Sequence, residues 1–166
     1  MVIRSEQPAD AEAIFHLIER AFEGKPYSAG TEPIIVDALR AAGVLTISLV
    51  AEVDGAIAGH VAFSPVIMSD GSRDWYGMGP VSVMPDRQRQ GIGSALIREG
   101  MAQMKAAGAK GCVVLGDPGY YERFGFRNTP DLRYEDAPQE YFLSLPFGES
   151  RARGSVQFHP AFSVRS

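Results

Sequence analysis

A glycine-bearing turn between an apolar stretch and an amphipathic stretch limits the folds open to this chain. The turn, residues 85–94, follows residues 79–83, which read as a strand, and leads directly into residues 92–104, whose apolar residues have helical spacing. Such a turn presents free backbone N–H groups at the positive end of a helix dipole, and that arrangement binds anions without requiring a particular side chain. Arg87 and Arg89 add positive charge on the approach. We therefore expect a phosphate-bearing ligand at this turn.

The periodicity of the remaining chain predicts a single α/β (α+β) domain. Residues 48–53 and 56–67 are strand-like on either side of Asp54-Gly55, a strong signal for a tight hairpin. The expected strands are residues 2–4, 48–53, 56–67, 75–83, 111–115, 140–145 and 155–158, and the expected helices are residues 8–23, 32–42, 92–104 and 120–124. This order is a helix pair, an antiparallel meander and then strand–helix–strand. It predicts a central mixed, mostly antiparallel sheet flanked by helices.

Composition narrows the classes of function. The length suits one domain, residues 1–166, and the net charge of −4 does not suit a general nucleic-acid binder. Cys112 is the only cysteine, which excludes an internal disulfide and a cysteine-based structural metal site, and its apolar neighbours predict a buried strand. The three histidines are far apart and no acids have ligand spacing, so we expect no metal. Without a signal pattern or a membrane-length apolar stretch, we expect a cytoplasmic protein that does not contact membranes.

Two common phosphate-binding motifs do not match the turn. A P-loop requires Lys-Ser or Lys-Thr after its second glycine, where this chain has Ile92 and Gly93-Ser94. A dinucleotide fingerprint requires a third glycine within a parallel unit, whereas the strands before this turn are expected to be antiparallel. The phosphate-bearing ligand is therefore expected to be of another class.

Three segments carry a family resemblance when they are taken in order. Residues 88–93, Gln-Arg-Gln-Gly-Ile-Gly, have the pattern Gln/Arg-x-x-Gly-x-Gly/Ala; residues 79–85 precede them as a strand; and residues 121–126, Tyr-Glu-Arg-Phe-Gly-Phe, have the pattern Tyr-x-x-x-Gly-Phe. This set resembles the GNAT superfamily of acetyl-coenzyme A-dependent N-acetyltransferases. The order of elements fits from residue 1 to about 126, the motif-bearing core, whereas residues 127–166 match only in having two strands.

The resemblance implies that acetyl-coenzyme A or coenzyme A is the phosphate-bearing ligand. Its pyrophosphate suits the N–H groups of residues 89–94 at the helix N-terminus, and the family implies that its pantetheine arm pairs with the backbone of residues 81–83 like an added strand. Pro80 lacks an N–H and Gly79 lacks a side chain, so we expect the strand to be bulged or splayed there, which leaves backbone groups free. The cofactor-binding residues predicted in this way are Val81, Ser82, Val83, Gln88, Arg89, Gln90, Gly91, Ile92, Gly93 and Ser94.

Tyr121 is the predicted catalytic residue. Transfer from a thioester expels a thiolate, and a nearby phenol can donate a proton or a hydrogen bond to that sulfur. A tyrosine with the ordinary pKa of about 10 stays protonated at neutral pH and suits this role. The alternatives are a core aromatic residue, or Tyr120 if the register differs by one. The family spacing to Gly125-Phe126 favours Tyr121.

The sequence does not assign a general base. Some enzymes of this type use an acid on the central strands, often through water, but residues 76–83 contain none. Glu52 and His60 lie on neighbouring strands, and Asp54 lies in the hairpin turn. His60 is expected to face the side of the sheet opposite to Ile57, Val61 and Phe63. A structural histidine is the favoured interpretation of it, and an amine that arrives neutral would need only water and backbone carbonyls.

Two functions are compatible with these features. The leading hypothesis is transfer of an acetyl group from acetyl-coenzyme A to a primary amine of a small-molecule or peptide acceptor, by direct attack in a ternary complex with Tyr121 assisting thiolate departure. The second is a non-catalytic coenzyme A-binding sensor or interaction module of the same fold. The acceptor is expected to meet the loop 24–31, the turn 69–75 and the C-terminal strands, which also offer an edge for a homodimer. Candidate pocket residues, each equally suited to ordinary packing, are Tyr27, Trp75, Tyr134 and Phe142.

Overall fold

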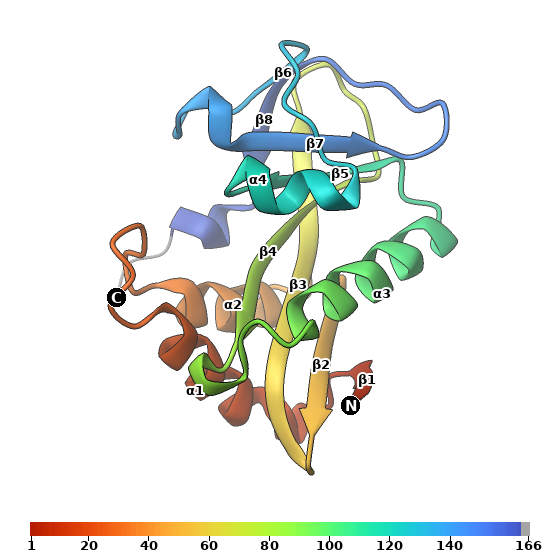
Figure 1. Ribbon diagram of the computed structural model, residues 1–166. Helices are drawn as coiled ribbons and strands as arrows, with labels where there is room; N and C mark the ends of the chain where they lie inside the picture. Colours follow the sequence, from red (N-terminus) through yellow and green to blue (C-terminus); the bar gives the residue numbers. More distant parts are fainter. Residues whose placement is uncertain (164–166) are drawn as a thin grey trace.

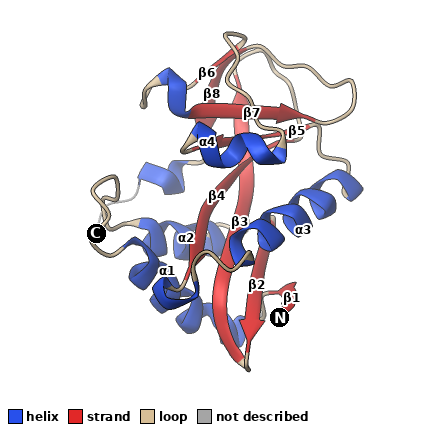
Figure 2. Cartoon of the chain, viewed as in Figure 1, coloured by secondary structure: helices blue, strands red, loops and turns tan. Residues whose placement is uncertain are grey.

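A mixed β-sheet runs through the centre of the protein, and helices cover both of its faces (Figures 1 and 2). The computed structural model describes residues 1–163. Its strands are β1 (Val2–Ser5), β2 (Ile47–Val53), β3 (Ala56–Met68), β4 (Trp75–Val83), β5 (Gly111–Leu115), β6 (Leu132–Arg133), β7 (Phe142–Pro146) and β8 (Gly154–Phe158). Its helices are α1 (Ala11–Phe22), α2 (Glu32–Ala41), α3 (Ile92–Ala106) and α4 (Pro118–Tyr121), with 3-10 turns at Pro8–Asp10, Pro85–Arg87, Glu122–Phe124, Gln139–Tyr141 and Pro160–Ser163.

The strand order confirms the predicted single-domain α/β fold. In the described residues the sheet has the order β1-β2-β3-β4-β5-β7, and β8 pairs with the end of β3 and with β6. The pairs β4–β5 and β6–β8 are parallel and the other strand pairs are antiparallel, so the sheet is mixed and mostly antiparallel as expected. The short β6 was not predicted. The strand expected from residue 140 begins at Phe142, because a 3-10 turn occupies Gln139–Tyr141.

Helix α3 packs on one face of the sheet through the residues predicted to face inward. These buried residues are Ile92, Leu96, Ile97, Met101 and Met104. Two glycines permit the close packing: a Cβ added to Gly59 of β3 would stand 2.7 Å from the Ile92 side chain, and a Cβ added to Gly100 would stand 2.3 Å from the Phe63 ring. The N-terminus of α3 is therefore held directly against β3.

Helices α1 and α2 cover the opposite face of the sheet. The buried residues that pack together there are Ile14, Ile18, Val36, Val50 and Ala62. His60 of β3 pairs with Val50 and is also fully buried on this face. The prediction that His60 lies on the face opposite to Val61 and Phe63 is therefore confirmed.

A β-bulge in the β2–β3 hairpin changes which residues share a face. Ala51 pairs with Gly59 but the next residue, Glu52, pairs with Ile57, so one residue of β3 is left between the two pairs. The sequence predicts that one face of the sheet carries Ile57, Val61 and Phe63. The bulge turns Ile57 to the face covered by α1 and α2, so the prediction is wrong for this residue.

The C-terminal part of the chain completes the sheet and builds a further apolar cluster. Its buried members are Val66, Met68, Trp75, Val113, Leu132, Phe142, Ala152 and Val156. Cys112 is fully buried in β5, as predicted for that apolar run. Each helix within residues 1–163 is too short or too polar to cross a bilayer.

Candidate functional site

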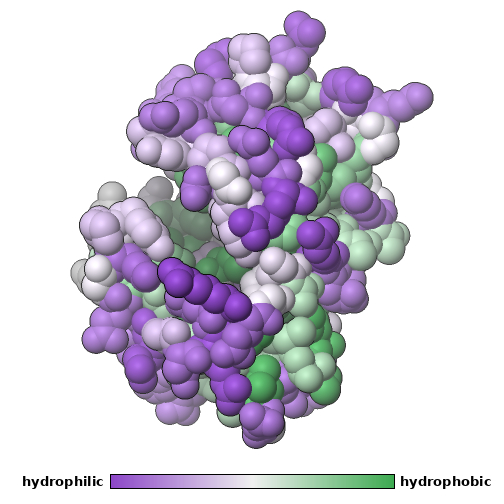
Figure 3. Space-filling model, in the orientation of Figure 1, coloured by the Kyte–Doolittle hydropathy of each residue, from purple (hydrophilic) through white to green (hydrophobic). Residues whose placement is uncertain are grey.

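A hollow opens in the surface between the part of the molecule that carries α4 and β5 to β8 and the part that carries α1, α2 and α3. The space-filling view shows hydrophobic surface at its floor and mostly polar surface around its rim (Figure 3). Strand β4 passes across this region, and α4 and the N-terminus of α3 lie at its sides (Figure 1).

The hollow follows from the divergence of β4 and β5. These parallel strands pair only through Trp75–Gly77 and Gly111–Val113, so on this edge the later residues of β4 have no strand beside them within the described chain. Along its other edge β4 stays paired with β3, but the register shifts where Gly79 and Pro80 lie. The bulge predicted from these two residues is therefore confirmed, and one edge of β4 is open.

The open edge presents the backbone groups of Val81 and Val83. The N–H of Met84 donates to the Ala58 carbonyl of β3 at 2.9 Å. Successive residues of a strand direct their N–H groups to opposite edges, so Val83 and Val81 direct theirs away from β3. The Val83 carbonyl on this edge accepts a hydrogen bond from the Gln88 side-chain amide at 3.2 Å.

The glycine-bearing turn leads from this edge into α3. Arg89 (φ 65°) and Gly91 (φ 84°) both adopt left-handed conformations, which belong to the backbone geometry of anion-binding loops. The first hydrogen bond of the α3 ladder runs from Ala95 N–H to the Gly91 carbonyl at 3.0 Å. The N–H groups of the first turn, residues 92–94, therefore have no carbonyl to bind within the helix and lie at the positive end of its dipole.

The predicted cofactor-binding residues form two adjoining groups, the open edge of β4 and the turn at the N-terminus of α3. The side chains of Ser82 and Ile92 are buried, whereas Gln88, Arg89, Gln90 and Gly91 are exposed, and Val81, Val83, Gly93 and Ser94 are partly buried. Arg87 differs from Arg89 because its guanidinium pairs with Asp54 of the β2–β3 hairpin at 3.3 Å.

The segment after β5 positions two tyrosines at the hollow. The Asp117 carboxylate caps α4 by accepting from Gly119 N–H at 3.0 Å. A Cβ added to Gly116 would stand 2.4 Å from the Tyr121 ring, so this glycine lets the ring lie against the end of β5. A Cβ added to Gly93 would stand 3.2 Å from the Tyr120 hydroxyl, which places that hydroxyl beside the first turn of α3.

Burial alters the acidity of Tyr121. Burial raises the pKa of the Tyr121 phenol well above its ordinary value, and the neighbouring phenols of Tyr120 and Tyr27 raise it further. The Tyr121 hydroxyl thus holds its proton across the neutral and mildly alkaline range. Tyr27 lies on the α1–α2 loop and is 76% exposed, yet it is near enough to contribute to this shift.

The three base candidates lie in different environments. Glu52 accepts from the Arg4 guanidinium at 2.6 Å, and Asp54 pairs with Arg87 in the exposed hairpin. His60 is fully buried, and its Nε2 lies 2.8 Å from Ser48 Oγ. Sequence reasoning missed this contact with Ser48.

Two of the four candidate pocket residues are core residues instead. Trp75 and Phe142 are each 2% exposed, so the alternative of ordinary packing applies to both. Tyr134 is partly buried and makes an edge contact with Phe158 of β8, with ring centroids 5.0 Å apart. Within residues 1–163, no group of three histidine, cysteine, aspartate or glutamate side chains is arranged to hold a metal ion.

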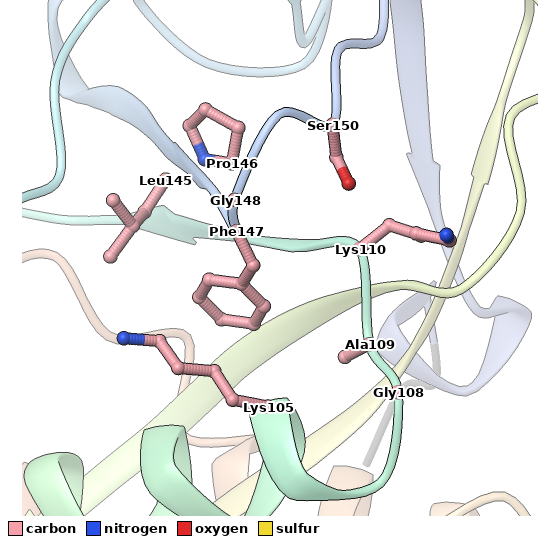
Figure 4. Close-up of a pocket in the computed structure, with 9 residues that line it drawn as sticks. All are labelled: Lys105, Gly108, Ala109, Lys110, Leu145, Pro146, Phe147, Gly148 and Ser150. Atoms are coloured by element: carbon pink, nitrogen blue, oxygen red, sulfur yellow. The ribbon is translucent and has the colours of Figure 1, made fainter.

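A separate cavity of about 430 Å³ lies at the other end of α3. Figure 4 shows Lys105, Lys110 and Phe147 among the side chains around it. The Lys105 ammonium lies over the Phe147 ring, 5.2 Å from its centroid. The turn at residues 88–94 and α4 do not contribute to this cavity, so it is distinct from the hollow.

Comparisons with known proteins place the relatives of this chain in one family. A family model described as an acetyltransferase (GNAT) domain matches residues 45–128. YhbS of Escherichia coli K12, described as an uncharacterized N-acetyltransferase, is 41% identical over 127 residues, which cover 76% of this chain and 73% of YhbS. A GNAT family acetyltransferase from Brucella melitensis, solved in complex with acetyl-CoA, is 53% identical with a TM-score of 0.86, covering 97% of each chain. The structure of E. coli YhbS in complex with CoA has a TM-score of 0.90 at 34% identity, covering 99% of this chain and 93% of that one.

Proposed function

The chain belongs to the GNAT family of acetyl-CoA-dependent acyltransferases, and from that premise we propose that it transfers an acetyl group from acetyl-CoA directly to a primary amine while both substrates are bound. The observation that supports this most is the continuity of the open β4 edge with the free N–H groups of α3. An extended pantetheine arm suits the first, and a pyrophosphate suits the second. Acetyl-CoA supplies the activated acetyl group as a thioester.

The residues of this chain would hold and orient that donor. Backbone groups of Val81 and Val83 would fix the arm, and residues 89–94 would bind the pyrophosphate through their N–H groups. Holding the thioester and the amine together would supply most of the rate enhancement, because it removes the entropic cost of their encounter. Water exclusion by the floor of the hollow would strengthen the polar contacts made there.

Tyr121 would give a proton to the departing thiolate. Its raised pKa keeps the phenol protonated under working conditions, and its ring lies at the end of β5 beside the hollow. Tyr120, whose hydroxyl lies beside Gly93, would instead contact the donor near the turn. This division of roles between neighbouring residues is testable.

We also propose that residues 1–166 act as one unit. Residues 1–126 would carry donor binding, and residues 127–166 would shape the acceptor side, because β7 pairs with β5 and β8 pairs with β3 beside the hollow. The acceptor would be a small-molecule or peptide amine that enters next to Tyr27 and the α1–α2 loop.

The test combines binding and turnover. Calorimetry with acetyl-CoA and with CoA should show binding, and a panel of primary amines should be screened for amine-dependent thiol release. Tyr121→Phe should lower kcat by about 10²-fold while leaving the Kd for acetyl-CoA within a few fold, and Tyr120→Phe should weaken donor binding more than Tyr121→Phe does. A reversed pattern would move the acid to Tyr120.

One observation favours a second function, a CoA-binding module without transferase activity. Strand β4 contains no acid, and the nearby acids Glu52 and Asp54 are engaged in ion pairs. Tight donor binding without amine-dependent thiol release from any acceptor would support the module. Failure to bind either acetyl-CoA or CoA would refute both functions.

A further inference from the structure

A chain of hydrogen-bonded polar groups crosses the protein on the face of the sheet covered by α1 and α2. His60 Nε2 lies 2.8 Å from Ser48 Oγ, and Ser48 Oγ is hydrogen-bonded to Glu6 Oε1. The Arg40 guanidinium donates to both oxygens of Glu6, at 2.8 and 3.0 Å. His60, at the inner end, and Ser48, next to it, are 0% and 8% exposed.

The outer end of this series of hydrogen-bonded groups, at Glu6, reaches solvent. Glu6, Ser48 and Arg40 line a surface cavity of about 330 Å³ between the start of β2 and the end of α2. Burial alone would raise the pKa of Glu6, but the hydrogen bonds from Arg40 and Ser48 outweigh it and hold the pKa below its usual value. Glu6 is therefore an ionised carboxylate at neutral pH.

The ionised carboxylate determines the tautomer of His60. A carboxylate only accepts hydrogen bonds, so the single Ser48 hydroxyl hydrogen must be donated to Glu6. Ser48 Oγ must then accept from His60 Nε2, which therefore carries the imidazole hydrogen. His60 Nδ1 is left as a bare acceptor.

The inner end of this series of hydrogen-bonded groups, at His60, lies next to β4. His60 Nδ1 and Ser82 Oγ have no hydrogen-bond partner among residues 1–163, although both residues are almost completely buried. Ser82 pairs directly with His60 across β3 and β4, so their side chains share a face, with Cβ atoms about 5 Å apart. Ser82 also lies between Val81 and Val83, which direct their N–H groups to the open edge. A buried polar atom without a partner is costly, and two of them side by side need an explanation.

We propose that Ser82, His60, Ser48 and Glu6 form a proton path that carries the proton of the acceptor amine from β4 to solvent. The inference rests on the proposed acetyltransferase function. It assigns residues to the deprotonation of the amine, a step for which Glu52 and Asp54 are poorly suited because both are engaged in ion pairs. His60 acts in it through Ser82 and is a positioning and relay residue.

The proton transfers balance along the path. As the amine nitrogen bonds to the acetyl carbon, its N–H bond breaks and the proton passes through one water to Ser82 Oγ. Ser82 gives its hydroxyl proton to His60 Nδ1, His60 gives its Nε2 proton to Ser48 Oγ, and Ser48 gives its proton to Glu6, which releases it to solvent. The thiolate takes its proton separately, from Tyr121. Between turnovers, Nδ1 returns its proton through Ser82 to water that enters the hollow, and Nε2 takes one from Ser48, which Glu6 and solvent replace; these transfers restore the starting tautomer.

The chain offers a matched pair of serine variants as a kinetic test. Ser82 and Ser64 are both buried, both have an unpartnered hydroxyl among residues 1–163, and both lie on the same face of the sheet. Ser64 is four residues from His60 on β3 and pairs with Gly77, so it is off the path. Ser82→Ala therefore removes the inner group of the path, and Ser64→Ala removes an equivalent hydroxyl elsewhere.

Thiol release from acetyl-CoA should be measured between pH 6 and 9 with spermidine, tyramine and an alanine-first hexapeptide as probe amines. At pH 7 we expect Ser82→Ala and Ser48→Ala to lower kcat about 10-fold to 10²-fold with an unchanged KM for acetyl-CoA, and Ser64→Ala to match the wild type. The loss should shrink as the pH approaches the pKa of the amine, because a neutral amine needs less help. The charged groups that act on His60 are Glu6 and Arg40, which keep their charge over this range. Equal rates for Ser82→Ala and Ser64→Ala at every pH would overturn the path.

A second measurement needs no acceptor. NMR of the protein with ¹⁵N-labelled histidine should show His60 protonated at Nε2, and its N–H should exchange with solvent at least 10-fold faster in the wild type than in Ser48→Ala. A proton at Nδ1, or equal exchange in the two proteins, would refute the path even if amines are acetylated. Absence of amine-dependent thiol release together with fast exchange through Ser48 would instead refute the transferase function and leave the connection to solvent in place.

Discussion

Mild acid should lower the free energy of unfolding of this protein, because the fold opposes protonation of His60. Burial lowers the pKa of His60 from 6.5 to about 4; the charge of Glu6 opposes that shift and the charge of Arg40 adds to it. Between these two pH values the unfolded chain binds a proton at this residue and the folded chain does not. Stability should therefore fall as the pH is lowered from about 6.5 towards 4.

The expected size follows from the two pKa values. The difference between the ordinary pKa of 6.5 and the folded pKa of about 4 corresponds to a total loss of about 3 kcal/mol in the free energy of unfolding. Of this, about 2 kcal/mol should be lost between pH 7 and pH 5. The pKa values of the carboxyls of Glu6, Asp10 and Asp70 are lowered in the fold. Their contributions are present above their unfolded pKa values and are lost only as the pH falls below about 4.5. Among these groups, only His60 accounts for the loss of stability between about pH 6.5 and pH 4.5.

Urea unfolding at pH 7, 6 and 5 measures this loss as a change in the free energy of unfolding at constant m. His60→Gln keeps a donor for Ser48 and cannot titrate, so its stability should change little over the same range, whatever its absolute value. If that variant does not fold, NMR titration of His60 in the wild type supplies the folded pKa directly. An imidazole that titrates between pH 6 and 7 in the folded protein, or an unchanged free energy down to pH 5, would refute the reasoning.

The other predictions concern packing and donor binding. Gly100→Ala should cost about 1–3 kcal/mol and lower Tm by several degrees, because the new methyl group meets the buried Phe63 ring; calorimetric melting checks this, and a Tm equal to that of the wild type would contradict it. Gly91→Ala should weaken acetyl-CoA binding several fold in a titration, because the turn needs a positive φ of 84° there. Arg89→Ala should weaken binding about 10-fold in low salt, and more than Arg87→Ala does, because Asp54 already engages Arg87; equal losses would show that both arginines contact the donor.

The motifs of this chain predict its fold well because they are local. The Asp54-Gly55 hairpin, the glycine turn and the inward face of α3 each depend on residues adjacent in the sequence. The irregularity at Gly79 and Pro80 was also predictable, because one residue lacks a side chain and the other lacks an N–H. These features set the open edge of β4 and the turn at the N-terminus of α3, where we propose that the donor binds.

The polar chain behind β4 could not be predicted because it depends on a register that no local pattern encodes. A regular hairpin would pair Val53 with Ala56 and, continuing without a bulge, His60 with Leu49. The bulge instead pairs His60 with Val50, which brings Ser48 within reach on the same face. Aromatic residues were ambiguous for a related reason: Trp75 and Phe142 are core residues, and only the packing of β5 to β8 distinguishes them from pocket residues.

Reliance on main-chain groups has a consequence for how this protein can diversify. Every non-proline residue carries the same N–H, so most substitutions at exposed positions such as Gln88 or Gln90 leave the main-chain donors of the turn intact. Replacement of Gly91 is different, because it alters the path of the main chain itself. Under the proposed function, the donor side would thus tolerate most substitutions, and the loops proposed to face the acceptor could change specificity without loss of the acetyl donor.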